Sequence, residues 1–230
     1  MFQSQGRQSF LDINMVPKKL HYCWFGKGEL PELYKECIST WGANMPEYEI
    51  FLWTEDNISI DTPFLSYAIK NKKWAFVSDY IRLRAIEQHG GVYLDTDIEV
   101  IKSFDSLLKY SCFLGYEDVG RLNTAVLGAV AGHPFIKDCR ELMEERFANN
   151  KPYLIAPEVA SVCAEKYLSD NDFFTCPEEY FYPYNPYAKH DRKFLMNKYV
   201  TENTYAIHHW GKGWKLGFFD RLKKKFECLA

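Results

Sequence analysis

The sequence predicts an α/β protein, a single domain in which helices pack on the faces of a sheet. Segments typical of strands alternate with segments typical of helices over the first 100 residues. The 230 residues are 47% apolar and 26% charged, a composition that suits one sizeable core. No internal repeat, low-complexity tract or composition break marks a linker. These observations favour one continuous domain.

The first elements are a strand, a helix and a second strand. Residues 18–26, KKLHYCWFG, are typical of a strand that ends at a glycine, and residues 48–54 are typical of another. Between them the pattern over 30–46 predicts a helix, with Pro31 in its first turn and Pro46 beyond its end. This is the order expected of an α/β sheet.

A helix over residues 75–91 leads directly into a strand. The helix is stopped by a Gly-Gly pair, after which VYLDTDIEV (92–100) is typical of a strand. Ligands of α/β sheets gather beyond the carboxyl ends of the strands, and Asp95 and Asp97 lie towards that end. The other expected elements are a helix over 62–74, strands over 112–117 and 123–130, helices over 133–149 and 156–169, and a late strand over 204–210.

Asp95 and Asp97 form a D-x-D motif within an apolar strand pattern. Side chains at positions i and i+2 of a strand project from the same face, so both carboxylates are expected to point one way. Two carboxylates that close repel each other unless water reaches them or a cation lies between them. A hard divalent ion such as Mn²⁺ or Mg²⁺ is the natural counter-charge. The alternative is a pair of aspartates solvated at a strand end.

Asp79 and Arg82 lie near the start of the preceding helix and share one of its faces, because they are three residues apart. An arginine there can form paired hydrogen bonds to phosphate, and an aspartate can accept hydrogen bonds from sugar hydroxyls. The alternative is an ordinary surface ion pair.

Overall charge and cysteine usage narrow the class of protein. The net charge of -3 gives no general attraction to nucleic acid, so no nucleic-acid partner is expected. The seven cysteines are scattered without a Cys-x-x-Cys pair, which favours reduced thiols. Residues 1–15 lack a signal-peptide pattern, and no segment is a candidate membrane span. We expect a cytoplasmic protein, free or peripheral on the inner face of a membrane.

Three blocks stand in an order that resembles a known enzyme family. They are VPKKLHYCWFGKGELP, AFVSDYIRLRAIEQHGGVYLDTDIEV and YAIHHWGKGW, and the resemblance spans residues 16–214. It is to glycosyltransferase family 32, D-x-D sugar transferases of the capsular-polysaccharide type that are related to yeast α-mannosyltransferases and clostridial glucosylating toxins. The resemblance implies a GT-A domain over 1–216, with a Rossmann-like mixed sheet and helices on both faces. It also implies a nucleotide-sugar donor, a UDP-sugar by preference, and Mn²⁺ or Mg²⁺.

The resemblance also implies roles for residues of the first two blocks. Asp97 would ligate the metal directly, and Asp95 would contact the sugar and ribose, or the metal through water. Asp79 and Arg82 match positions that touch the donor sugar and the diphosphate. Further donor contacts are expected from Tyr22, Trp24, Tyr93 and Asn123, although the first-block aromatics could equally be core residues and Asn123 a turn residue.

In the late block, His208 matches the histidine that completes the metal shell, and Trp214 matches a tryptophan near the β-phosphate. Strand alternation puts only one of His208 and His209 on the site face, and we expect His208. Family members often have serine before that tryptophan where this chain has Gly213, so a hydroxyl contact to metal or phosphate is missing and Lys212 could replace some of its charge.

The implied activity is retaining transfer of a hexose from the nucleotide sugar to a saccharide or lipid-linked saccharide in bacterial surface-polysaccharide synthesis. Two alternatives stay open, a catalytically inactive nucleotide-sugar-binding module and a metal-dependent nucleotide-sugar hydrolase. A glycoside hydrolase is disfavoured, because Asp95 and Asp97 on one strand face cannot flank a sugar ring.

Three further segments are candidates for the acceptor side. Residues 178–187, EEYFYPYNPY, could form an aromatic sugar platform through Tyr182 and Tyr184, and Glu158 could face the acceptor or serve a helix start. Residues 217–230 are typical of a basic amphipathic helix. Such a helix either lies on an anionic membrane surface or packs on the domain.

Overall fold

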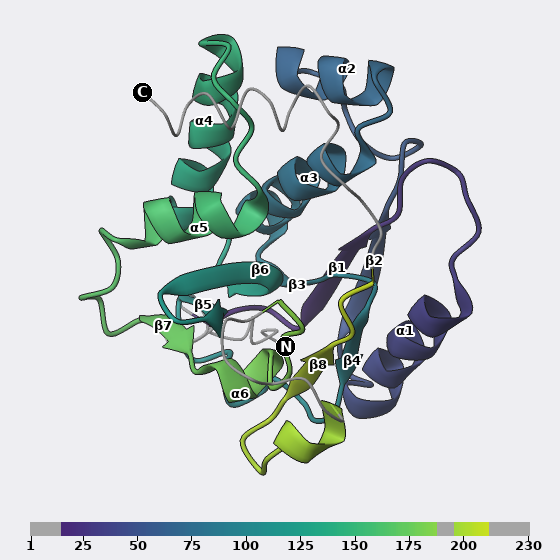
Figure 1. The fold of residues 1–230 in the computed structure, drawn as a ribbon, viewed down its shortest axis with the longest axis vertical. Helices are drawn as coiled ribbons and strands as arrows, with labels where there is room; N and C mark the ends of the chain where they lie inside the picture. The colour runs from purple at the N-terminus through teal and green to yellow at the C-terminus, as the bar shows by residue number, and fades with distance from the viewer. Residues whose placement is uncertain (1–14, 188–195, 212–230) are drawn as a thin grey trace, which may run out of the picture.

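The computed structural model describes residues 15–187 and 196–211, and its centre is a six-stranded mixed sheet (Figure 1). The strand order is β2-β1-β3-β6-β5-β7. All neighbouring pairs are parallel except those that β6 makes with β3 and β5. The strands are β1 Lys19–Cys23, β2 Glu49–Trp53, β3 Gly91–Leu94, β5 Cys112–Asp118, β6 Arg121–Ala129 and β7 Phe173–Cys176.

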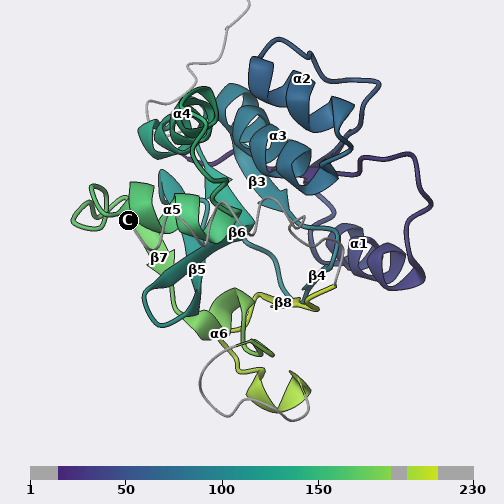
Figure 2. The same cartoon turned by 45° about the horizontal axis from the view of Figure 1, so that its top comes forward.

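Helices cover both faces of this sheet, as predicted (Figures 1 and 2). On one face lie α2 Pro63–Lys70, α3 Trp74–His89, α4 Pro134–Ala148 and α5 Ala156–Ala164. On the other lie α1 Glu32–Asn44, α6 Glu178–Phe181 and a small sheet of β4 Ile98–Val100 and β8 Ala206–His208. A 3₁₀ turn, Met196–Tyr199, precedes β8. A hydrophobic core lies on each face of the sheet, and successive side chains of a strand point to opposite faces. In β3, Tyr93 therefore packs in the first core, and Val92 and Leu94 pack in the second.

The Gly-Gly pair between α3 and β3 is required by the backbone. Gly90 and Gly91 have φ angles of 60° and 112°, which side-chain-bearing residues rarely adopt. A Cβ on Gly91 would also lie 2.7 Å from the carbonyl oxygen of Lys19. The tight passage brings the end of α3 against β1 and fixes where β3 begins, so the position of Asp95 follows from it.

The expectation of one continuous strand over 92–100 is wrong. The chain leaves the large sheet after Asp95, whose N–H donates to the carbonyl of Ala125 at 2.8 Å. It then turns, with the Ile98 N–H donating to the Asp95 carbonyl at 3.0 Å, and enters β4 in the other sheet. Asp95 and Asp97 therefore flank a turn between two strands, and the same-face argument for their carboxylates does not apply.

Smaller differences concern the ends of elements. The helix expected to Ser169 ends at Ala164, and strand β7 was not expected. The strands expected at 112–117 and 123–130 are the two arms of the β5–β6 hairpin, which extend further toward the turn between them. The proposed helix over 217–230 and the domain boundary at 216 lie outside the described residues. Within residues 15–187 and 196–211, no helix is long and apolar enough to cross a membrane.

Candidate functional site

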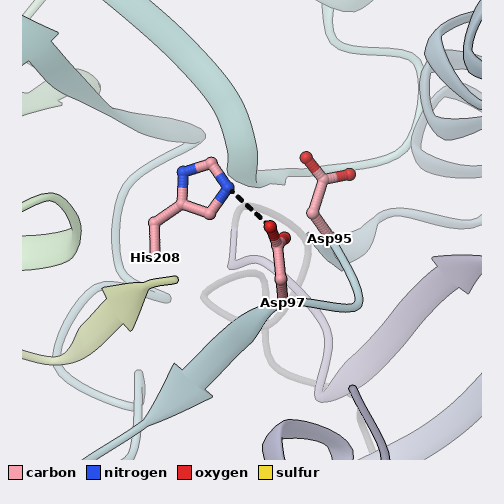
Figure 3. Close-up of side chains that lie close together, drawn as sticks. All are labelled: Asp95, Asp97 and His208. Atoms are coloured by element: carbon pink, nitrogen blue, oxygen red, sulfur yellow. Dashed lines mark ion pairs between the residues drawn. The ribbon is translucent and has the colours of Figure 1, made fainter. Parts of the chain in front are cut away.

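Three potential metal ligands converge where the two sheets meet (Figure 3). Asp95, Asp97 and His208 each offer one ligand atom, and these atoms lie within 4.8 Å of one another. Asp95 follows β3, Asp97 precedes β4, and His208 ends β8. The antiparallel pairing of Ile98 with His208 is what carries the histidine to the D-x-D turn from the far end of the chain.

Asp97 is held in place from two directions. Its Oδ2 accepts a hydrogen bond from the Gly211 N–H at 2.7 Å and lies 3.2 Å from Nε2 of His208. Burial acts to raise the pKa of Asp97, but the attraction of His208 and the hydrogen bonds from His208 and Gly211 outweigh it and lower the pKa. Asp97 is thus an oriented carboxylate that is ionised at neutral pH.

His208 is buried, and only one of its two ring nitrogens has a partner among the described residues. Nδ1 has no hydrogen-bond partner among the described residues. Burial acts to lower the pKa of His208, but Asp97, Asp95 and Glu117 outweigh it and raise the pKa. The next residue turns away, because Nε2 of His209 lies 2.7 Å from Oε2 of Glu99. Only the ring of His208 therefore lies beside the Asp97 carboxylate, while His209 meets Asp97 through its backbone N–H, which donates to the Asp97 carbonyl at 2.9 Å.

This donor set fits a divalent ion. Carboxylate oxygens with one imidazole nitrogen suit Mn²⁺ and similar ions. Two ligands of one octahedral ion of this size lie at most about 4.2 Å apart, so small side-chain shifts would let all three bind. Burial of Asp97 and His208 at 7% and 8% exposure also sets them apart from a solvated acidic cluster.

Arg82 joins the D-x-D turn to helix α3. Its guanidinium donates to Oδ1 of Asp79 at 2.8 Å and lies 3.1 Å from Oδ1 of Asp95. It also donates to the Thr124 carbonyl at 3.0 Å and lies 4.5 Å from the ring centroid of Tyr93. A buried arginine with this set of partners orders the carboxylates around it.

Two tyrosine hydroxyls complete this network. Tyr153 donates to Oδ2 of Asp79 at 2.6 Å, and Tyr93 donates to Oδ1 of Asp95 at 2.9 Å. Burial raises the pKa of Asp79, and the nearby Arg82 only partly offsets this. Asp79 and Arg82 are therefore a buried pair and not the surface ion pair that the sequence left open.

The network borders a cavity of about 680 Å³. This volume lies in the range of about 300–1,000 Å³ that small-molecule sites occupy. Eight of the residues expected from the sequence line it: Trp24, Asp79, Arg82, Tyr93, Asp95, Asp97, Asn123 and His208. The structure thus brings together side chains from the first, middle and late blocks.

Tyr22 does not belong to this cavity, contrary to expectation. Strand β1 alternates, so Cys23 faces the cavity whereas Tyr22 faces the opposite side of the sheet. The Tyr22 ring packs edge-on against Trp41, with the centroids 5.4 Å apart. Tyr22 is partly buried and packs against the second core.

The tyrosine-rich segment contributes a different residue from those expected. Tyr182 is fully buried and its hydroxyl accepts a hydrogen bond from the Val126 N–H at 3.2 Å, so it is no sugar platform. Tyr184 stacks on Tyr199 and does not line the cavity. Tyr187 does line it, is 65% exposed, and packs edge-on against Trp210. The proline-rich spacing signalled a shaped loop but not which ring faces outward.

Glu158 has the local role that the sequence allowed. Its carboxylate accepts a hydrogen bond from the Ile155 N–H at 3.0 Å, at the start of α5. The late-block residues Lys212, Gly213 and Trp214 lie outside the described residues.

Glu117 was missed by the sequence argument. It is 5% exposed in the cavity wall, accepts a hydrogen bond from the Asn123 side chain, and pairs with Arg121 at 2.5 Å. Burial raises its pKa, although Arg121 and Asn123 act in the other direction. No motif marks it: Glu117 lies at a register shift in the hairpin, two residues after Gly115, the strand partner of Asn123.

Comparison with protein families agrees with this geometry. Residues 31–114 match the family described as glycosyltransferase sugar-binding region containing DXD motif. The resemblance to D-x-D sugar transferases is confirmed. The matched segment holds Asp79, Arg82 and the D-x-D turn, while His208 lies beyond it.

Similar proteins include enzymes that act on ceramide lipids, by their names. Inositol phosphoceramide mannosyltransferase 3 of Schizosaccharomyces pombe is 29% identical over 153 residues, which are 60% of this chain and 40% of the relative. Lactosylceramide 4-alpha-galactosyltransferase of Homo sapiens is 26% identical over 171 residues, 66% of this chain and 48% of the relative. The chain thus spans less than half the length of these two relatives.

A solved structure shares the fold. The PaToxG glycosyltransferase superposes with a TM-score of 0.58 at 18% identity, over 67% of this chain and 70% of that one. The expected α/β fold of the GT-A type is confirmed. At this identity the likeness concerns the fold alone.

Proposed function

We propose that this chain transfers a hexose from a nucleotide-diphosphate sugar, a UDP-sugar by preference, to a saccharide or lipid-linked saccharide acceptor, in a metal-dependent reaction. One observation carries the proposal: Asp95, Asp97 and His208 converge within 4.8 Å in the wall of a cavity of about 680 Å³. A nucleotide sugar needs such a volume, and its diphosphate needs such a charge partner.

The chain's own residues hold the ligands in advance of binding. The Gly211 N–H and His208 orient Asp97, while Tyr93 and Arg82 orient Asp95. When bound by Asp95, Asp97 and His208, a divalent ion would supply positive charge against the diphosphate as it departs. Arg82 adds a fixed positive charge that needs no reorganisation during the reaction.

Other lining groups suit the neutral parts of the donor. The side chains of Asn123 and Glu117 hold each other in the cavity wall, where they can meet sugar hydroxyls. The rings of Trp24, Tyr187 and Trp210 also line the cavity and offer faces on which a base or sugar can stack.

In the proposed reaction the bond between the anomeric carbon and the diphosphate oxygen breaks. The acceptor hydroxyl oxygen forms a bond to that carbon from the same side, and its proton passes to the departing phosphate oxygen. The anomeric configuration is retained. The Glu117 carboxylate is already occupied by a hydrogen bond from Asn123 and an ion pair with Arg121. This supports direct transfer over a route in which Glu117 attacks the sugar and forms a covalent intermediate.

The names of two relatives support a lipid-linked acceptor, because both name a ceramide. The basic segment 217–230 would then be the peripheral membrane contact, from the cytoplasmic side. Surface-polysaccharide synthesis remains a prediction from the sequence.

Calorimetric titration of UDP and of GDP into the full chain, with Mn²⁺ or with EDTA, tests the donor site. We expect one nucleotide to bind only with Mn²⁺ and to lose at least about 100-fold in affinity in Asp97→Ala. Asp118→Asn is the matched control, because Asp118 lines the same cavity outside the ligand cluster. A nucleotide affinity that neither EDTA nor Asp97→Ala changes would refute the proposal.

The same preparation separates transfer from hydrolysis. Each UDP- or GDP-sugar is incubated with Mn²⁺, with and without lactosylceramide in detergent, and the released nucleotide is compared with the sugar incorporated. Sugar incorporation supports transfer. Metal-dependent release of nucleotide that no acceptor changes would favour the nucleotide-sugar hydrolase instead.

A further inference from the structure

A second cavity, here called the aromatic pocket, lies between helices α2, α3 and α4 and the start of α5. Its volume is about 220 Å³. Figure 2 shows α2, α3 and α4 side by side on this face. The lining residues are Phe64, Tyr67, Phe76, Met143, Arg146, Phe147, Asn150, Lys151, Tyr153, Leu154 and Val159. Most are apolar, two are cationic and none is anionic.

The walls of the pocket are packed rings. Tyr153 stacks on Phe76 with the centroids 3.6 Å apart, and Phe64 lies parallel to Tyr153 at 6.3 Å. Phe147 meets Phe64 edge-on at 5.6 Å. The loop beneath is fixed by Arg146, which donates two hydrogen bonds to the Pro152 carbonyl at 3.0 and 2.8 Å. The pocket is therefore a formed cavity and not a gap between mobile side chains.

The interior of the aromatic pocket favours an apolar ligand. The buried side-chain atoms without a partner, among the residues described, are Nε of Arg82 and Nδ1 of His208, and both belong to the other cavity. A cavity of about 150 Å³ lined by Leu, Ile and Phe stays dry and binds apolar molecules. At about 220 Å³ the aromatic pocket is smaller than the sites of about 300 Å³ or more that hold drug-sized ligands. It suits one narrow apolar chain.

The rim of the pocket selects the charge of the ligand. Lys151 is exposed beside Arg146, and the ammonium of Lys73 lies 5.4 Å and 4.9 Å from the ring centroids of Tyr67 and Phe76. The positive charge of the exposed Lys151 would attract an anionic head group.

We propose that the aromatic pocket binds the apolar chain of an anionic amphiphile, with the head group at Lys151. The site lies next to the donor cavity but is distinct from it. Tyr153 separates the two: its ring lines the aromatic pocket and its hydroxyl holds Asp79 in the donor cavity. The inference does not depend on the proposed transferase activity.

Calorimetric titration of butyl, hexyl, octyl and decyl phosphate, each below its micelle concentration, tests the proposal on the full chain without nucleotide or metal. Affinity should rise about fourfold per added methylene until the pocket is full. Lys151→Glu should weaken octyl phosphate about tenfold and leave 1-octanol unchanged. Lys109→Glu, an exposed lysine on the other face of the sheet, should change neither.

Leu154→Trp is the companion variant, because the larger side chain fills the pocket. It should abolish binding of all four phosphates while far-ultraviolet circular dichroism shows a folded chain. If this variant does not fold, Lys151→Glu and the chain-length series still decide. No binding of any phosphate to the full chain, an affinity independent of chain length, or an equal loss in Lys109→Glu would overturn the proposal.

Discussion

The two cavities on either side of Tyr153 differ in the side chains that form them. The donor cavity is organised by buried charges, with Asp79, Arg82, Asp97 and His208 all less than 9% exposed. The aromatic pocket is organised by stacked rings. Ring packing tolerates changes of similar volume, whereas a buried charge tolerates no loss of its partner. We conclude that the stability of the donor cavity depends on individual polar partners, whereas that of the aromatic pocket depends on ring packing shared with the main core.

The largest effect should come from removing Arg82. Arg82→Ala leaves Asp79 and Asp95 without their shared cation, and we expect a loss of about 3–5 kcal/mol in the free energy of unfolding. Arg84→Ala on the same helix is the control, because Arg84 pairs with the half-exposed Asp61 and should cost at most about 1 kcal/mol. Urea titrations measure both. Equal losses in the two variants would mean that the buried network is no more important than a surface pair.

Tyr182→Ala should cost about 3 kcal/mol, because it opens a void behind the donor cavity and leaves the Val126 N–H unpaired. The measurement is again the free energy of unfolding in urea. Tyr184→Ala, in the same segment but half-buried, should cost less than half as much. A stable Tyr182→Ala protein with a raised acceptor KM would restore the sugar-platform interpretation of this residue.

Tyr153→Phe tests the boundary between the cavities. It keeps the ring that stacks on Phe76 and removes only the hydrogen bond to the buried Asp79, for an expected loss of about 2 kcal/mol. Tyr67→Phe, across the aromatic pocket at a residue that is 40% exposed, should change stability by less than about 0.5 kcal/mol. Thermal or urea unfolding of both gives the comparison. A neutral Tyr153→Phe would show that the two cavities are not linked through this hydroxyl.

The smallest effect on stability should come from Tyr187, a residue that is 65% exposed at the donor cavity. Tyr187→Ala should leave the free energy of unfolding within about 0.5 kcal/mol of the wild type. It should weaken binding of a nucleotide sugar about fivefold, because one stacking surface is lost. Calorimetry on the folded variant measures this. An unchanged affinity would remove Tyr187 from the site.

The local parts of this structure could be predicted from the sequence. Pro63 and the Gly90–Gly91 pair determine where α2 begins and α3 ends through their own backbone restrictions. The D-x-D turn could not, since its shape depends on β4 leaving the large sheet to pair with β8 at the other end of the chain. Local patterns carry no information on such non-local pairing.

The candidate site divides in the same way. Asp95 and Asp97 were predicted from the D-x-D motif and His208 from the family resemblance, and the structure brings the three together. Glu117 and Tyr153 were missed, because each acquires its position from a neighbour that is distant in sequence or across a hairpin. The aromatic pocket had no sequence signal, because four helices and a loop share its lining without a common spacing.

Electron paramagnetic resonance of Mn²⁺ in the presence of UDP or GDP tests the central claim most directly. The claim is that Asp95, Asp97 and His208 form one metal site. We predict one bound Mn²⁺ per chain that His208→Ala releases and that Asp118→Asn and His209→Ala retain, since His209 faces Glu99. Bound Mn²⁺ that survives His208→Ala, or that His209→Ala releases equally, would contradict the account.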